Sequence, residues 1–538
     1  MEPIYIHTHQ KSESLWQKLL SADGPTTRDS NPLNKDLKAQ VVVVGAGISG
    51  LTTAYLLLKE GYEVVVLDKD SLGRNETGLT SAHLSNALDD GYYNIRKWHG
   101  DRGCQLAFES HTAAINTIEQ ICTAENISCE FSRVSGYLFL GPNQEMRHLI
   151  EELTACHVAG FLDVELFPQI PVSFFNSGQT LMFPQQAQFH PIKYMYGLVE
   201  SVLRLGGKIF WNTQVTDVKG GANAQVITSH NHIVSCNYCV VATNVPMNNR
   251  VIVHTKEAAY RTYIIGMKVP HGMMPPMLIW DASDPYHYVR LQSDPNKKED
   301  ILIIGGEDHR VGQKPANESP YKNLKLWAKK VLKIDYPISC QWSGQIVEPT
   351  DGLAYVGHNP RDHRNVFIAT GDSGHGLTHG TIAGLLLKDL ICGKTNEWAK
   401  LYDPRRKNWK ELGSYLKENI NTAAQYGDWL AGGIDSVKNI KPREGGIITQ
   451  GLSKVAVYKD SDGETHTFSA TCPHLGGVVR WNTVEKTWDC PCHGSRFNCY
   501  GEVINGPANV GLSEAVLPLP QQPPPKSPPM RPSASSSV

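Results

Sequence analysis

Residues 41–68 hold a strand, a glycine-rich turn, a helix and a second strand in immediate succession, and few folds accommodate that order. The apolar run 41–44 is typical of a buried parallel strand, residues 51–60 of an amphipathic helix, and 64–67 of a second buried strand ending at Asp68. The helix N-terminus would face a pyrophosphate, and Asp68 would bind ribose hydroxyls. The segment therefore predicts a dinucleotide-binding unit in a parallel α/β domain. Its turn carries the glycines of that motif at Gly45, Gly47 and Gly50.

Near the other end of the chain, two short loops each contain one Cys and one His. Two thiolates can hold one iron of a [2Fe–2S] cluster while two neutral imidazoles hold the other. Zinc is the alternative, because two Cys and two His also complete a tetrahedral site. Zinc sites usually group like ligands, whereas each loop here supplies one of each kind, so the pattern favours the cluster. The predicted ligands are Cys472, His474, Cys490 and His493.

The Pro and Gly spacing of both loops resembles the Rieske proteins, and short strands between residues 440 and 517 suit the small all-β module that this resemblance implies. In respiratory Rieske proteins a Cys closes the first loop and forms a disulfide with the middle Cys of the second. Gly477 and Cys492 hold these positions here, so the resemblance implies no disulfide. Ser495 stands where a serine bonds the cluster, but Phe497 replaces a tyrosine that also does. Fewer hydrogen bonds predict a potential below the respiratory class.

Residues from Gln40 to about Asn421 resemble the D-amino-acid-oxidase-like (DAO) family of FAD-dependent oxidoreductases. Besides the glycine turn, the resemblance is carried by the segments 80–84, 188–191, 213–216, 239–244 and 370–380. It implies FAD as the cofactor, with the late glycine-rich turn meeting the flavin ring. A second complete fingerprint is absent from the sequence, which favours direct reduction of the flavin by an organic substrate. The predicted FAD contacts are Gly45, Ala46, Gly47, Ile48, Ser49, Gly50, Asp68, Lys69, Thr80, Ser81, Val215, Thr243, Gly374, His375, Gly376 and Leu377.

Between these segments, residues 129–184 and 258–344 predict a second, largely antiparallel sheet that roofs the flavin. On a strand, residues 286, 288 and 290 share one face, and an Arg there could clamp a substrate carboxylate through two hydrogen bonds. The alternative is an ordinary sheet surface with cross-strand aromatic pairs, and the pattern favours that alternative. The candidate substrate-facing residues are Arg261, Tyr263, Tyr286, Tyr288 and Arg290. As catalytic candidates we select His375, His83, Arg261 and Tyr288.

Three further patterns have alternative interpretations. The spacing of Asp372, His375 and His379 matches a mononuclear iron site, but it lies inside the glycine-rich turn and before the Rieske module. His83 stands near the position at which some relatives attach their flavin covalently; non-covalent FAD is the preferred interpretation. Cys236 and Cys239 could form a dithiol pair, although buried strand cysteines fit the pattern better.

Composition limits the classes of binding partner and the cellular compartment that we expect for this chain. With 51 basic and 53 acidic residues, the chain gives no reason to expect nucleic acid or an anionic membrane as a partner. Its apolar runs are too short to span a bilayer, and its N-terminus lacks a signal-peptide pattern. The 12 cysteines are too few for a disulfide framework in a chain of 538 residues. A cytoplasmic location is expected.

The predicted fold class is an α/β FAD-binding domain with an antiparallel-sheet substrate domain, plus a small all-β Rieske domain. The expected segments are a lead-in (1–39), the oxidoreductase domain with its inserted substrate subdomain (40–425), a linker (426–439), the Rieske domain (440–517) and a disordered Pro/Ser tail (518–538).

These features predict an FAD-dependent oxidoreductase of the amine or amino-acid dehydrogenase or oxidase type. A small amine or amino-acid-like substrate would reduce the flavin by hydride transfer, and the [2Fe–2S] cluster would pass electrons singly to an external one-electron carrier protein. Two alternatives stay open. The chain could be an electron-transfer component for a partner oxygenase or reductase, or a redox-responsive binding protein without turnover.

Overall fold

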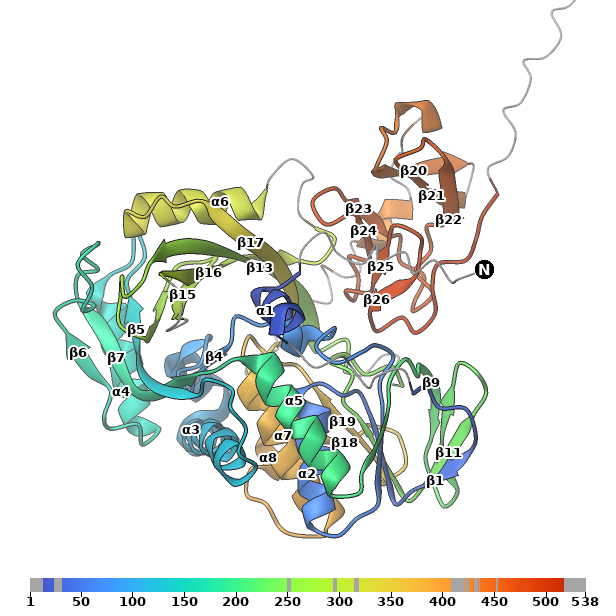
Figure 1. The fold of residues 1–538 in the computed structure, drawn as a ribbon, viewed down its shortest axis with the longest axis horizontal. Helices are drawn as coiled ribbons and strands as arrows, with labels where there is room; N and C mark the ends of the chain where they lie inside the picture. The colour runs from blue at the N-terminus through green and yellow to red at the C-terminus, as the bar shows by residue number, and fades with distance from the viewer. Residues whose placement is uncertain are drawn as a thin grey trace, which may run out of the picture.

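The computed structural model describes residues 13–23, 31–248, 253–293, 298–313, 319–407, 421, 425–429, 434, 436–450 and 453–516. The predicted tail and part of the predicted lead-in lie outside these residues. In the described part of the chain, every helix is too short or too polar to cross a membrane. Three bodies are visible in Figure 1: a helix-covered parallel sheet, a large antiparallel sheet, and a smaller all-β unit formed by the last described residues.

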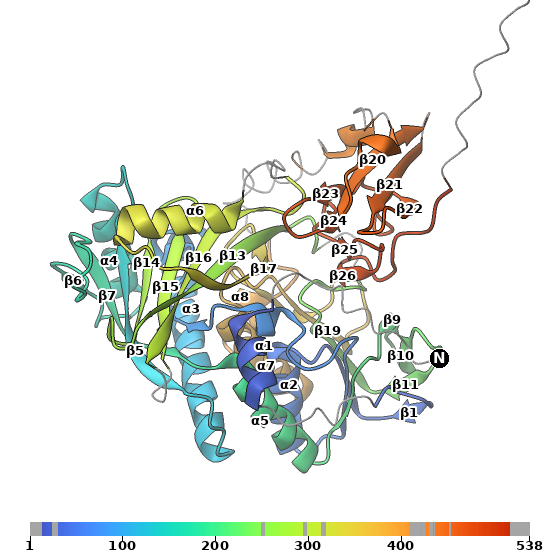
Figure 2. The same ribbon diagram turned by 45° about the horizontal axis from the view of Figure 1, so that its top comes forward.

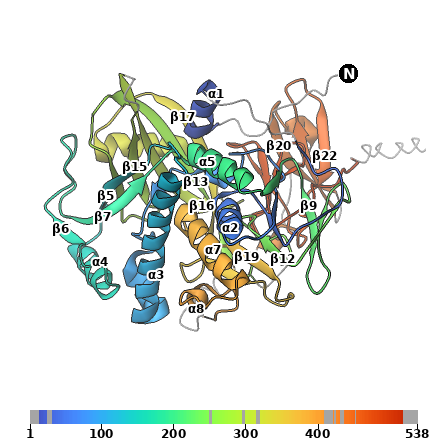
Figure 3. The ribbon, with the colours of Figure 1, turned by 60° about the horizontal axis from the view of Figure 1, so that its bottom comes forward.

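A six-stranded sheet carries the glycine turn, and its central strands are buried on both faces because they consist almost entirely of valine. Val41 and Val43 face one side, where α2, α5 and α7 pack, while Val42 and Val44 face a small four-stranded sheet. Figure 3 shows these three helices side by side. The strands are, in order, β18 (Tyr355–His358), β19 (Val366–Thr370), β12 (Tyr238–Val241), β2 (Val41–Val44), β3 (Val64–Leu67) and β8 (Lys208–Phe210); all but β18 pair in parallel.

The covering helices are α2 (Ile48–Lys59), α3 (Gly91–Ala124), α5 (Pro191–Arg204), α7 (Gly376–Ile391) and α8 (Ala399–Tyr402). The small sheet consists of β1 (Leu37–Lys38), β11 (Ile233–Cys236), β10 (Ala224–Thr228) and β9 (Val215–Lys219).

A nine-stranded sheet forms the second body, as the sequence predicted, and only β14 and β5 pair in parallel within it. Alternate residues of its strands face opposite ways. Ile265 and Met267 pack toward α6, whereas Ile264 faces Trp342 and Tyr288 on the other side. Its strands are β17 (Ile338–Pro349), β13 (Glu257–Pro270), β16 (Glu299–Arg310), β15 (His287–Gln292), β14 (Met277–Asp281), β5 (Ser132–Phe139), β7 (Thr180–Gln188) and β4 (His83–Leu84), with β6 (Glu165–Phe167) beside β7. Helices α4 (Met146–Val158) and α6 (Pro320–Trp327), the π-helical turn Ala328–Leu332 and the 3₁₀ turn Glu76–Leu79 complete this region.

The predicted lead-in contains a helix, α1 (Leu15–Asp23), that packs into the molecule. Trp16 is fully buried, and its indole N–H donates to the carbonyl of Thr80 at 2.6 Å. The segment from Glu13 to Gln17 therefore belongs structurally to the oxidoreductase body.

The all-β unit has two small sheets and stands above the junction of the other two bodies (Figure 2). Three of the short strands predicted between residues 440 and 517 are β20, β21 and β22. Its elements are β20 (Glu444–Gln450), β21 (Ser453–Lys459), β22 (Thr465–Ser469), β23 (Arg480–Asn482), β24 (Thr487–Asp489), β25 (Arg496–Asn498) and β26 (Val503–Asn505), preceded by 3₁₀ turns at Tyr426–Trp429 and Val437–Asn439.

Candidate functional site

A cavity of about 1060 Å³ lies at the carboxyl ends of β2, β3 and β12, beneath the nine-stranded sheet and beside the all-β unit. This edge of a parallel sheet is where such folds bind ligands. Of the predicted cofactor contacts, all but Ala46 and Gly50 line the cavity: Gly45, Gly47, Ile48, Ser49, Asp68, Lys69, Thr80, Ser81, Val215, Thr243, Gly374, His375, Gly376 and Leu377.

The first glycine turn is shaped to let a phosphate approach the backbone. Gly45 has a φ of +103°, and a Cβ there would lie 2.4 Å from the carbonyl oxygen of Ala242. A Cβ on Gly50 would lie 1.8 Å from the carbonyl oxygen of Gly45, so Gly50 lets α2 pack against the turn. Gly47 precedes α2 without a capping side chain, which leaves this helix start suited to a pyrophosphate.

Asp68 lies at the end of β3 and is oriented by backbone N–H groups. Its carboxylate accepts hydrogen bonds from Ala46 N at 2.6 Å and Asp70 N at 2.9 Å. Burial raises the pKa of Asp68 to about 6 despite these bonds. The carboxylate therefore stands beside the glycine turn, as the binding of ribose hydroxyls requires.

The second glycine-rich turn forms the opposite end of the cavity. Gly374 has a φ of +72°, and a Cβ there would lie 1.9 Å from Oδ2 of Asp89. The next residues open α7. The turn thus presents backbone rather than bulky side chains, which fits the close approach of a flavin ring.

Three polar side chains, those of Asp89, Tyr286 and His375, line this end of the cavity. His375 Nε2 lies 3.0 Å from Oδ1 of Asp89, and the Tyr286 hydroxyl donates to Oδ2 of Asp89 at 3.0 Å. Burial opposes ionisation of both members of the pair. Their mutual attraction nevertheless raises the pKa of His375 and lowers that of Asp89. The backbone N–H of Asp89 also donates to His375 Nε2 at 2.9 Å, so the two residues hold each other in place at the cavity wall.

His83 also lines the cavity but has a different character. Its ring contacts Ser81 Oγ and the carbonyl of Val289, and it lies edge-on to Tyr288 at 5.3 Å between centroids. Burial and the nearby Arg290 lower the pKa of His83 to about 3. A neutral imidazole lines the pocket here, and covalent attachment of FAD to His83 stays an open alternative.

Three of the five predicted substrate-facing residues, Arg261, Tyr263 and Arg290, do not line the cavity, and this corrects the sequence analysis. Arg261 does not line the cavity; its guanidinium is fully buried and pairs with Glu485 of the all-β unit at 2.7 Å. Tyr263 lies on the same strand face, stacked on His309 at 5.4 Å. Both residues have odd numbers on β13, whereas Thr262 and Ile264 face the cavity.

The shared face of residues 286, 288 and 290 exists, but only its tyrosines reach the cavity. Tyr286 and Tyr288 line it, while the guanidinium of Arg290 donates to the carbonyls of Ala82 and Phe189. Neither predicted arginine is available to clamp a substrate carboxylate.

Several carboxyl groups surround this end of the cavity, and burial raises the pKa of each. The pKa is raised to about 7 at Asp372 and Asp308, to about 6 at Asp90, and well above its usual value at Glu348. Among the described lining residues, Lys and Arg occur only at Lys69 and Arg74, in the segment that follows Asp68 at the nucleotide end. The flavin end is therefore acidic.

The mononuclear iron interpretation fails because its three side chains have separate partners. Asp372 Oδ1 accepts from Val347 N at 2.6 Å, His375 pairs with Asp89, and His379 contacts His111 at 3.2 Å. Among the described residues, no three His, Cys, Asp or Glu side chains are grouped as ligands of one metal ion. Cys236 and Cys239 are buried within or beside strands, as preferred.

The four predicted cluster ligands lie in two adjacent loops. Cys472 and Cys490 are each 2 % exposed, and the rings of His474 and His493 lie 5.1 Å apart at 90°. A hydrogen bond from Cys490 N to the Ser495 carbonyl at 2.8 Å braces the second loop. Two thiols on one side and two imidazoles on the other fit a cluster whose irons each take two protein ligands, and zinc, which needs convergent ligands, fits less well.

The loop residues agree with the predicted loss of the disulfide. A Cβ on Gly477 would lie 2.5 Å from the sulfur of Cys492, and Cys492 forms no disulfide with any described residue. Gly477 thus faces Cys492 where the respiratory proteins would place a bonded cysteine. His254 of the oxidoreductase body contacts both histidines, with centroids 5.1 Å from His474 and 6.3 Å from His493.

Sequence reasoning missed several residues of the site. Asp89 meets His375 across 286 positions, and no local pattern marks it. Glu13 and Gln17 line the cavity from the lead-in, and residues 503–509 line it from the all-β unit. Only the fold brings these segments to one place.

Comparisons with known proteins agree with this geometry. The family model for FAD dependent oxidoreductases (DAO) matches residues 40–390, and that for the Rieske [2Fe-2S] domain matches residues 433–518. The Rieske 2Fe-2S iron-sulfur protein YhfW of Bacillus subtilis (strain 168) is 29% identical over 90% of this chain and 95% of its own length. Gamma-glutamylputrescine oxidoreductase of Escherichia coli (strain K12) is 24% identical over 67% of this chain and 85% of its own length. Glycine oxidase from Geobacillus kaustophilus shares the fold, with a TM-score of 0.58, 16% identity, and coverage of 69% of this chain and 99% of that chain.

Proposed function

We propose that this chain, which belongs to the DAO family of FAD dependent oxidoreductases and ends in a Rieske [2Fe–2S] domain, oxidises a small amine and sends the electrons singly through its own cluster to an external acceptor. The chain is an FAD-dependent oxidoreductase; the substrate and the electron path are the proposed parts. The acidic flavin end of the cavity is the observation that carries the choice of substrate.

The many carboxyl groups of that end favour an amine over an amino-acid carboxylate as the group bound there. Asp89 and Asp372 line it, Asp308 and Glu348 lie nearby, and neither Arg261 nor Arg290 reaches it. An ammonium group would replace lost water contacts with charge-assisted hydrogen bonds to Asp89 and the tyrosines. A substrate carboxylate would lie among buried carboxyl groups, and the nearby His375 is already paired with Asp89. A diamine or N-alkyl amine fits this site better than a simple α-amino acid.

FAD, when bound in the cavity, would accept a hydride from the carbon next to the amine nitrogen. The protein's task is to hold that carbon in place and to remove the ammonium proton. Asp372 has a pKa near neutrality and lines the cavity, so it is placed to take a proton. His375 Nε2 accepts a hydrogen bond from the backbone N–H of Asp89 at 2.9 Å and lies 3.0 Å from Oδ1 of Asp89, so each residue fixes the position of the other beside the amine. Tyr286 and Tyr288 line the same end of the cavity.

The position of the cluster ligands supports transfer within the chain. Both histidine ligands face His254 of the oxidoreductase domain. This contact directs the histidine side of the cluster toward the FAD domain. A built-in one-electron outlet favours a dehydrogenase over a peroxide-forming oxidase.

A cytoplasmic location is part of this proposal. None of the 12 cysteines, all of which lie in the described residues, forms a disulfide, and Gly477 stands where the respiratory Rieske proteins carry the disulfide partner of Cys492. A reducing compartment suits such a chain.

The test is anaerobic reduction of the purified, iron-replete protein by a panel of diamines, N-alkyl amines and α-amino acids, followed by flavin absorbance. Amines should bleach the flavin at lower concentration than the matched amino acids. Asp89→Asn should remove this preference while leaving reduction by dithionite intact. Preference for α-amino acids would contradict the substrate assignment, and failure of every candidate would favour an electron-transfer component that needs a partner enzyme.

A further inference from the structure

The nucleotide end of the FAD cavity has walls from two domains. One wall is the oxidoreductase domain, with Asp68, Val215 and Thr243. The other is residues 503–509 of the Rieske domain, all seven of which line the cavity. We call residues 503–509 the closing segment.

Hydrogen bonds tie the closing segment to the residues around the nucleotide end. Lys69 Nζ donates to the carbonyl of Ile504 at 2.6 Å, and Asn505 Nδ2 donates to Oε1 of Glu76 at 2.7 Å.

A reciprocal pair of bonds fixes the far end of the segment. Gln214 Nε2 donates to the carbonyl of Asn509 at 2.8 Å, and Asn509 Nδ2 donates to the carbonyl of Thr216 at 3.1 Å. The segment is thus bonded to three separate parts of the oxidoreductase domain.

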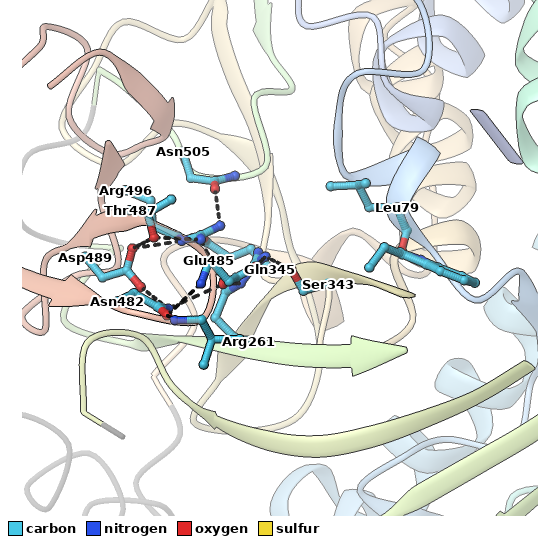
Figure 4. A network of polar contacts seen from close by, with 12 residues as sticks. Leu79, Arg261, Ser343, Gln345, Asn482, Glu485, Thr487, Asp489, Arg496 and Asn505 are labelled. Carbon is cyan, nitrogen blue, oxygen red and sulfur yellow. Dashed lines mark hydrogen bonds and ion pairs between the residues drawn. The ribbon is translucent and has the colours of Figure 1, made fainter. Parts of the chain in front are cut away.

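A buried ion network holds the segment from the Rieske side (Figure 4). Glu485 pairs with Arg261 of β13 at 2.7 Å and with Arg496 of β25 at 2.8 Å. Arg496 reaches Asn505 Oδ1 at 3.3 Å, so the network continues into the closing segment. Both arginines are fully buried, which makes this a fixed junction between the domains.

The same segment also touches the cluster loop. Ala508 N donates to Oγ of Ser495 at 3.0 Å, and Ser495 is fully buried two residues after the ligand His493. The closing segment therefore contacts the FAD cavity on one side and the cluster-binding loop on the other.

We propose that the closing segment is a working part of the FAD site: it covers the adenosine end of the bound cofactor, and FAD is retained only while the Rieske domain is docked. This inference goes beyond the proposed function and does not depend on which substrate is oxidised. It means that a chain whose Rieske domain has lost its cluster and its folded loops releases FAD.

The test compares the rate of FAD release, followed by the fluorescence of free FAD after dilution, in the holoprotein and in the variant Asn505→Ala/Asn509→Ala. Two hydrogen bonds to the oxidoreductase domain are lost, which corresponds to release on the order of tenfold faster. Asn439→Ala is the matched control, because Asn439 is an exposed asparagine of the same domain outside the cavity lining. Iron content and the Rieske EPR signal are measured in each protein, so that cluster loss is distinguished from a direct effect.

Release from the double variant at the control rate, with iron retained, would overturn the proposal. Hydrogen–deuterium exchange on the wild-type chain tests whether the closing segment covers the bound FAD, even if the double variant does not fold. Peptides covering residues 503–509 should exchange faster after FAD is stripped, while β21 (Ser453–Lys459) should be unaffected. Equal exchange of the closing segment with and without FAD would contradict the proposal.

Discussion

Replacing Glu485 by glutamine tests the junction between the two domains. The substitution keeps the shape of the side chain but removes the charge between Arg261 and Arg496. Breaking a buried ion pair by removing one partner typically costs about 3–5 kcal/mol, because a charge is left without compensation. Here the buried Arg261 loses its ion pair with Glu485, whereas Arg496 keeps a second ion pair with Asp489 at 3.1 Å.

The pKa of Glu485 allows the contribution of these ion pairs to the free energy of unfolding to be worked out in a second way. Burial alone would raise this pKa, but Arg261 and Arg496 lower it from its usual value of 4.5 to about 2. A difference of roughly 2.5 units corresponds to about 3 kcal/mol of stability at neutral pH. Because the folded-state pKa is the lower one, this contribution is complete above about pH 4.5 and is lost as the pH falls toward 2.

The assay is denaturant unfolding followed by the visible circular dichroism of the cluster. We expect Glu485→Gln to lose about 3 kcal/mol, and Glu464→Gln, an exposed carboxylate of the same domain, to stay within about 0.5 kcal/mol of wild type. The loss should shrink when unfolding is measured below pH 4. A Glu485→Gln protein as stable as the Glu464→Gln control would refute the reasoning.

Three further predictions concern the cofactor sites. Asp372→Asn should abolish the rise in reduction rate with pH near 7, because the carboxylate must be deprotonated to accept a proton; an unchanged pH profile would exclude this residue as the base. Gly374→Ala should lower FAD content at least about tenfold, since the added Cβ would lie 1.9 Å from Asp89 and strain a φ of +72°; the flavin-to-protein absorbance ratio measures this. The cluster potential should lie in the lower half of the roughly −150 to +300 mV Rieske range, and Phe497→Tyr should raise it by adding a hydroxyl that can bond the cluster. Redox titration followed by EPR measures both potentials, and a wild-type midpoint in the upper half of that range would contradict the account.

Local patterns predicted the elements that local physics determines. The valine strands 41–44 and 64–67 are present residue for residue as β2 and β3, because a buried parallel strand needs β-branched residues on both faces. The helix after the glycine turn begins earlier than expected, at Ile48 rather than Leu51, since Gly47 already serves as its N-cap. The three predicted strands of the Rieske domain are also present.

Partners across long sequence separations could not be predicted in this way. Arg261 has the right residue type and strand for a substrate clamp, but alternation along β13 turns it away from the cavity and toward Glu485, 224 residues later. No local sequence pattern marked Asp89 or the closing segment, because each acquires its role only where separate elements of the fold meet. The sequence identified the two cofactor sites, and the structure was needed to show that they share a wall.

The most direct test of the account is an anaerobic experiment on one chain holding both FAD and the cluster. A reactive amine is added without dithionite, and flavin absorbance and the Rieske EPR signal are recorded together. The account predicts that the EPR signal of the reduced cluster grows with the amine, at a rate independent of protein concentration. A flavin that bleaches fully while the cluster stays oxidised until dithionite is added would contradict electron transfer within the chain.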